Sequence, residues 1–226
     1  MGSLSFSTNT FLELVKQDLM DMFSDFHSGE FDIHRLNFAM LTVIPKEVDA
    51  SSMKKFRPIS LLNCSFKIFS KVLTNRLTKI LQKLIASNQS AFLKGRYILE
   101  SVVTDNEVHH SVHSSKRQGR VLKLDYENAY DMINMEFLLD MMNKRGFSNK
   151  WMEMVEPLLH KGSVGVRIND TNSESFIAGK GVRQGDTASP LLFNLAADVF
   201  TRILAKAANQ NMIAGVFPPS NPAGVI

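Results

Sequence analysis

The stretch VLKLDYENAYDMI, residues 121–133, carries the clearest local pattern in the chain. A short apolar run ends on Asp125, which predicts a strand over residues 119–125. The pattern after it changes to helical spacing, so we expect a helix over about residues 126–142. A carboxylate therefore stands where a strand ends and a helix begins.

Two explanations account for Asp125. Aspartate is a favoured N-cap residue, and on spacing alone this is the simpler one. The alternative is a metal ligand at the carboxyl end of a strand, because Mg²⁺ prefers hard carboxylate oxygens. Tyr130, which directly precedes Asp131, places an aromatic ring one helical turn beyond this carboxylate.

The composition indicates a globular chain of one large or two small domains. Of its 226 residues 44% are hydrophobic and 21% are charged, and the net charge is +4. That mild excess is compatible with a polyanionic partner. The single cysteine, Cys64, excludes an internal disulfide and favours a reducing, intracellular compartment, without separating nucleus from cytoplasm. No apolar run is long enough to predict a transmembrane helix.

Helices and strands are expected to mix without a regular βαβα order, which favours an α+β fold. The periodicity predicts helices over 10–27, 66–85, 100–115, 148–162 and 189–209, a strand over 38–46 and a β-hairpin over 163–182. We expect Ser189 to be the N-cap of the last helix and Pro190 its first residue.

The predicted helix 66–85 is amphipathic, and its charged residues are all basic. They are Lys67, Lys71, Arg76, Lys79 and Lys83. A solvated face is the ordinary explanation of such a pattern. The absence of acidic residues favours the alternative, a surface that binds nucleic-acid phosphates.

A glycine-flanked loop follows the hairpin. It contains Arg183, Gln184 and Gly185, and glycines let the backbone approach a ligand closely. With Lys46 and Arg57 as phosphate-binding cations and a carboxylate for metal, the chain has the residue types that phosphoryl transfer requires.

Five stretches in order carry a resemblance. They are FRPISLLN (56–63), KVLTNRL (71–77), NQSAFLKGR (88–96), KLDYENAYD (123–131) and GVRQGDTASPLLFN (181–194). Over residues 11–215 the chain resembles the reverse transcriptase of non-LTR (LINE-type) retrotransposons, closest to the plant branch. The resemblance implies a right-hand polymerase: a fingers-like region over 1–118, whose first ten residues are unmatched, and a partial palm over 119–226, with no thumb.

The resemblance also implies site residues for RNA-directed DNA synthesis. Asp125 matches the first catalytic aspartate, which binds Mg²⁺, and the carbonyl of Tyr126 would add a ligand. Tyr130 matches the aromatic under the incoming sugar. Lys46 and Arg57 match finger residues that grip the triphosphate.

Further residues are expected to contact substrate and nucleic acid. The loop of Arg183, Gln184 and Gly185 would pack against the nascent base pair, and Arg96 would lie near the template. The expected partners are an RNA template, a DNA primer and deoxynucleoside triphosphates. The oligomeric state is left open.

The sequence departs from the family in two places. Thr187-Ala188 stands where the family has Pro-Leu, and adjacent aspartates, the family's third palm motif, do not occur. We therefore expect this chain alone not to polymerise DNA. Two alternatives stay open: a non-catalytic remnant that binds nucleic acid, and a pseudogene product that does not fold stably.

Overall fold

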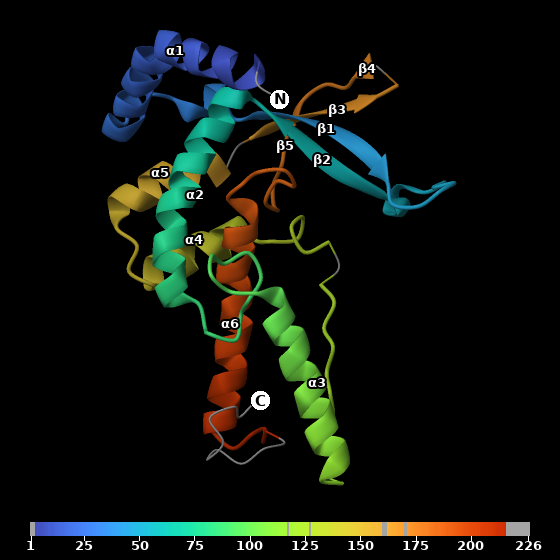
Figure 1. Cartoon of the computed structure of the whole chain (residues 1–226). Helices are drawn as coiled ribbons and strands as arrows, with labels where there is room; N and C mark the ends of the chain where they lie inside the picture. Colours follow the sequence, from blue (N-terminus) through green and yellow to red (C-terminus); the bar gives the residue numbers. More distant parts are fainter. Residues whose placement is uncertain (1–2, 117, 127, 160–161, 170, 216–226) are drawn as a thin grey trace. The chain divides into compact units, whose positions relative to one another are not determined.

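The computed structural model describes residues 3–116, 118–126, 128–159, 162–169 and 171–215. These residues form six α-helices and a small mixed sheet, so the predicted α+β class is confirmed (Figure 1). The chain divides into two interleaved compact units. The first unit is Met1–Ser70 with Met142–Gly179, and the second is Lys71–Met141 with Lys180–Ile226. The division into fingers (1–118) and palm (119–226) stays a prediction.

The sheet belongs to the first unit. Strand β1 (Phe38–Pro45) pairs antiparallel with β2 (Phe56–Leu62) and parallel with β3 (Ser163–Ile168). Two short strands, β4 (Thr171–Asn172) and β5 (Phe176–Ile177), pair antiparallel with β3. The predicted strand at 38–46 and the hairpin after residue 163 are therefore confirmed. Figure 1 shows β1 and β2 as the long blue and teal arrows.

The core of the first unit centres on two phenylalanines at the start of helix α2 (Cys64–Leu84). Phe66 is fully buried and packs with Ala39 and Leu62 of the sheet. Phe69 contacts three rings whose centroids lie 4.3–5.9 Å away; they are Phe23 and Phe26 of helix α1 (Ser3–Ser28) and Phe31. These contacts join α1, α2 and the sheet.

Helix α5 (Asn149–Leu159) completes the first unit. Its Trp151 is buried. The side-chain amide of Asn37 donates to the carbonyl of Pro157 over 2.8 Å, which ties α5 to the residue preceding β1. Two 3-10 turns, η1 (Ile33–Arg35) and η2 (Met53–Lys55), precede β1 and β2.

The second unit is helical. It contains the remainder of α2, helix α3 (Ile98–Ser114), most of helix α4 (Met135–Lys144) and helix α6 (Ser189–Asn209). Its buried side chains include Leu73, Leu77 and Leu81 of α2, Leu138 of α4, and Leu191, Leu192 and Leu195 of α6. Helix α3 has no buried residue. No helix among the described residues is both long and apolar enough to cross a bilayer.

The strand predicted over 119–125 is wrong, and so is the start of the helix after it. Residues 118–126 have no regular structure, and Val121, Leu122 and Leu124 are exposed. A short apolar run forms a strand only when a neighbouring strand pairs with it, and none of the described strands pairs with residues 118–126. The next helix, α4, begins at Met135, because Asn128 takes a left-handed backbone (φ 50°) and starts a turn.

Candidate active site

Two segments far apart in the sequence are hydrogen-bonded to each other in the second unit. The N–H of Val182 donates to the carbonyl of Tyr130 over 2.7 Å, and the N–H of Gly181 donates to the carbonyl of Ile133 over 2.8 Å. The turn after Asp125 is therefore fixed against the start of the glycine-flanked loop. The sequence pattern predicted both segments, and the structure brings them together.

Gly181 is required at this contact. A Cβ at this position would lie 2.7 Å from the carbonyl oxygen of Asp131 and 2.8 Å from its Cα, and φ is +89°. Both the space and the backbone conformation exclude other residues. The sequence led us to expect a close approach to a ligand here, whereas this glycine approaches the chain's own backbone.

One side chain of the loop contacts the same turn. The amide nitrogen of Gln184 lies 3.5 Å from both carboxylate oxygens of Asp131, a weak charge-assisted contact. Burial lowers the pKa of the Arg183 guanidinium, and the carboxylate of Asp186 opposes that effect. Gly185 is exposed, with φ +105°.

The N-cap of α6 differs by one residue from the prediction. The helix starts at Ser189, and Ala188 is its N-cap, so the expected Ser189 cap is wrong. The Ser189 hydroxyl instead donates to the carbonyl of Arg183 over 2.7 Å. This bond closes the loop, and the Thr187 and Thr74 hydroxyl oxygens lie 3.3 Å apart, connecting it to α2.

Phe193 of α6 supports the two tyrosines of the quoted stretch. Its ring centroid lies 5.5 Å from that of Tyr130 and 5.8 Å from that of Tyr126, the latter edge to face. Tyr130 is half-buried, and desolvation raises the pKa of its hydroxyl. Sequence reasoning missed Phe193, although an aromatic in the first turns of a helix after a predicted binding loop was a usable signal.

Asp125 is exposed and directly precedes Tyr126 in the chain. Within the described residues, no three acidic, histidine or cysteine side chains gather where they could hold a metal ion. One carboxylate with a backbone carbonyl fits part of a metal site. It does not fit a complete two-metal centre.

Lys46 and Arg57 belong to the first unit, on the hairpin of β1 and β2. The ammonium of Lys46 donates to the carbonyl of Lys54 over 2.9 Å, and its backbone N–H donates to Lys55. Arg57 is exposed on β2, opposite Ile44. Their roles in binding triphosphate stay predictions.

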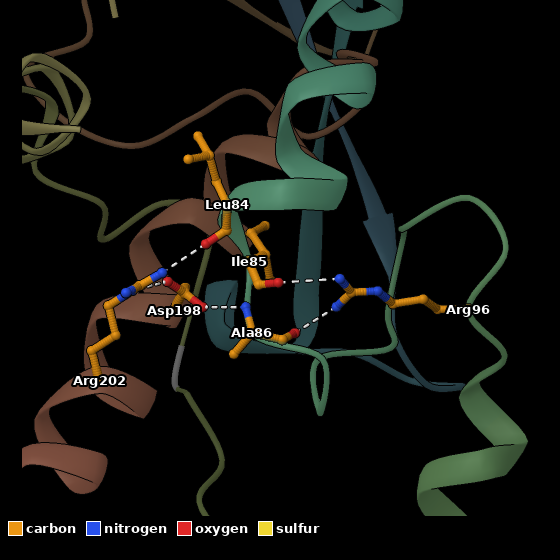
Figure 2. Close-up of polar contacts among 6 residues, drawn as sticks. All are labelled: Leu84, Ile85, Ala86, Arg96, Asp198 and Arg202. Carbon is orange, nitrogen blue, oxygen red and sulfur yellow. Dashed lines mark hydrogen bonds and ion pairs between the residues drawn. The ribbon is translucent and has the colours of Figure 1, made fainter. Parts of the chain in front are cut away.

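The five basic residues of α2 are all exposed: Lys67, Lys71, Arg76, Lys79 and Lys83. Arg96 differs from them, since its guanidinium donates to four backbone carbonyls of the chain. Figure 2 shows it directed at the end of α2. Its hydrogen-bonding capacity is thus largely used within the second unit, and a template contact by Arg96 stays a prediction.

Comparison with known proteins agrees with this arrangement. The family model described as reverse transcriptase (RNA-dependent DNA polymerase) matches residues 44–216, which is most of the chain. The chain belongs to the reverse transcriptase family. Members of this family are nucleotidyltransferases that generally use a divalent metal ion, a nucleic-acid template and nucleotide substrates.

Three relatives are proteins of transposons or retrotransposable elements. The transposon TX1 uncharacterized 149 kDa protein of Xenopus laevis is 29% identical over 168 residues, covering 74% of this chain and 13% of that protein. The Pol polyprotein of the type-2 retrotransposable element R2DM of Drosophila melanogaster is 28% identical over 190 residues, covering 81% of this chain and 18% of that protein. The R2 Pol polyprotein of Nasonia vitripennis is 24% identical over 162 residues, covering 72% of this chain and 16% of that protein.

This reverse transcriptase domain therefore spans less than a fifth of the length of those relatives. The identification as a reverse transcriptase domain of the non-LTR retrotransposon type is confirmed. The assignment to the plant branch stays a prediction.

Proposed function

We propose that this domain holds the nascent base pair and the incoming nucleotide during RNA-directed DNA synthesis. One observation carries the proposal: two backbone hydrogen bonds fix the Tyr130 turn to the loop that contains Gln184. A half-buried ring and a polar side chain are thus held near each other by backbone rather than by flexible side chains. Such positioning supplies much of the catalysis in phosphoryl transfer.

The proposed roles follow from the chemistry of each residue. The Tyr130 ring lies under the deoxyribose and leaves no room for a 2′-hydroxyl. Gln184 packs against the base pair while its amide is oriented by Asp131. Lys46 and Arg57 bind the triphosphate, and a guanidinium can contact phosphate oxygens in two places.

Asp125 would hold Mg²⁺ together with the carbonyl of Tyr126, and the ion would neutralise charge on the reacting phosphate. Two such ions about 4 Å apart repel each other by on the order of 15–20 kcal/mol at an effective dielectric of about 20. Substrate phosphates offset part of this, and one aspartate does not supply the rest. We therefore propose that the 226-residue chain alone does not extend a primer.

Primer extension tests the last statement. The chain is incubated with an RNA template, a DNA primer, deoxynucleotides and Mg²⁺, beside an Asp125→Ala variant. We expect the two to be indistinguishable. Template-dependent extension by the unmodified chain above that of the variant would contradict the proposal.

Nucleotide selectivity tests the role of Tyr130 without turnover. In complex with template and primer, we expect the chain to bind a complementary deoxynucleotide more tightly than the ribonucleotide, by about 10–100-fold. Tyr130→Val should abolish this preference, whereas Tyr130→Phe, which keeps the ring, should retain it. Equal binding of both nucleotides by the unmodified chain would exclude the proposed sugar contact.

A second candidate function is nucleic-acid binding without catalysis, and the exposed basic face of α2 favours it. A phosphate-binding face loses affinity steeply as salt rises, with a slope of about 0.9 for each phosphate contact on a duplex. Replacing Lys71, Arg76, Lys79 and Lys83 by glutamine should flatten that slope. If the slope does not change, α2 has only a solvated face.

A further inference from the structure

The connector between α2 and α3, residues 85–97, is held from one side by a polar row on α6. Asn194 donates to the carbonyl of Ala91, and its side-chain oxygen accepts from the amide of Gln89. One turn further along α6, Asp198 accepts the N–H of Ala86 over 2.8 Å. Both α6 side chains are 1% exposed, so these bonds form in the core of the second unit.

Two arginines complete the attachment, as Figure 2 shows on either side of residues 84–86. Arg202 donates to Asp198 and to the carbonyl of Leu84, both over 2.7 Å. On the opposite side, Arg96 donates to the carbonyls of Gln82, Ile85, Ala86 and Gln89. The connector is therefore rigid at its base.

The middle of this rigid connector exposes an aromatic ring. Phe92 is 63% exposed, although the next residue, Leu93, is buried. Its backbone is left-handed, with φ +58°. The other described non-glycine residues with positive φ are all polar: Asp49, Lys116, Asn128, Asn169 and Asn211.

Neither burial nor backbone preference explains a phenylalanine at this position. A bulky residue with positive φ is strained, by about 1–3 kcal/mol, and such strain persists mainly at functional sites. An exposed ring recovers little of that cost through the hydrophobic effect. The ring of Phe92 is therefore best explained by contact with a ligand.

The sequence on both sides of Phe92 is basic, which points to the class of ligand. From Lys71 to Leu99 the chain has no aspartate or glutamate, and its basic residues are Lys71, Arg76, Lys79, Lys83, Lys94 and Arg96. Lys83 and Lys94, before and after the ring, are exposed. Exposed aromatic rings beside cations bind single-stranded nucleic acid, because bases stack on the ring while the cations neutralise phosphates.

We propose that Phe92 stacks on an unpaired base of a nucleic-acid strand whose phosphates contact Lys83 and Lys94. Asn194, Asp198, Arg96 and Arg202 are positioning residues, which hold the connector so that the ring stays exposed. The proposal deepens the proposed function, on which it rests, by adding a binding site outside the Tyr130 cluster.

Binding of short single-stranded RNA tests the proposal. The probe is a fluorescein-labelled oligoadenylate, with a blunt RNA–DNA duplex for comparison, and anisotropy gives the Kd. Phe92→Leu should weaken binding of the single strand about tenfold, since it keeps an apolar side chain but cannot stack. Phe92→Trp should retain the affinity, and binding of the blunt duplex should change in neither variant.

Leu99→Ala is the matched control, because Leu99 is 70% exposed and lies just after the connector. It should leave the affinity unchanged. An equal loss in Phe92→Leu and Leu99→Ala would show that binding depends on exposed apolar area in general and would overturn the stacking site. So would equal affinity of Phe92→Leu and the unmodified chain.

Stability gives an independent measurement. Phe92→Gly removes the strain, so it should raise Tm by about 2–4 °C while weakening the binding of single strands. A lower Tm would show that the ring has a structural role only. If the unmodified chain binds neither probe, the proposed function fails as well; if it binds both and Phe92→Leu has no effect, the stacking site alone is wrong.

Discussion

The α2–α3 connector and the segment 118–126 are both irregular stretches of the second unit, and they are held in opposite ways. The connector is bonded on two sides by side chains from α6 and by Arg96. The segment that carries Asp125 exposes its apolar residues, and its described side-chain contact is the ring of Tyr126 against Phe193. Of these two segments, the one held by more side-chain hydrogen bonds is thus not the one with the candidate catalytic carboxylate.

The difference shows what holds an irregular segment in one conformation. Backbone groups of a loop have no regular partners, so buried side chains must satisfy them, and each such bond fixes one geometry. Asp198 does this for the connector. Asp125 has no comparable role in the fold, which leaves its oxygens accessible to a ligand.

Asp198→Ala should have the largest effect on stability. It removes the acceptor for the N–H of Ala86 and for Arg202, so we expect a loss of about 2–4 kcal/mol in the free energy of unfolding. Urea denaturation followed by circular dichroism measures it. Asp105→Ala, at an exposed position on α3, is the control and should change stability little; equal losses would remove the special role of Asp198.

Gly181→Ala should be nearly as damaging, because the new Cβ would meet the backbone of Asp131. Gly95 is the matched position: its φ is also positive, at +78°, but nothing lies within 4 Å of a Cβ there. We expect about 1 kcal/mol for Gly95→Ala from backbone strain and at least 1–2 kcal/mol more for Gly181→Ala. Similar melting temperatures for the two variants would mean that the close contact is absent in solution.

Arg96→Lys should cost about 1.5–3 kcal/mol, since one ammonium cannot reach four carbonyls arranged for a planar guanidinium. Arg76→Lys, on the exposed face of α2, serves as the control in thermal melting. If the two arginine variants have the same melting temperature, Arg96 does not hold the connector. Its predicted contact with the template then becomes the better explanation of an arginine at this position.

Asp125→Ala should have the smallest effect on stability, within about 0.5 kcal/mol of the unmodified chain, because the side chain is exposed. The same denaturation experiment measures it. A loss comparable to that of Asp198→Ala would show that Asp125 has a structural role, and this would count against its assignment as a metal ligand.

Local patterns in the sequence predicted most of the elements. The apolar periodicity placed α2 and α6 within two residues of their observed ends, and the strand predicted over 38–46 agrees with β1 to within one residue. The motif residues 130 and 184 were recognised from the sequence, and they lie in segments that are bonded to each other.

The failures have one physical cause. The apolar run before Asp125 forms a strand only if another strand pairs with it, and the N-cap at Ser189 depended on a hydroxyl that bonds to the carbonyl of Arg183 instead. The polar row on α6 could not be predicted from the sequence for the same reason. Asn194 and Asp198 lie on a helix that is apolar around them, and only tertiary contacts reveal their partners.

The parallel pairing of β1 with β3 has a consequence for synthesis on the ribosome. When the hairpin of β1 and β2 emerges, β3 has not yet been translated, and the first half of the second unit is made in between. The nascent chain must keep one edge of β1 unpaired until Ser163 and the residues after it arrive. Contacts between such distant segments form slowly and leave strand edges open to aggregation, so chaperones that bind extended apolar segments should associate with the domain at this stage.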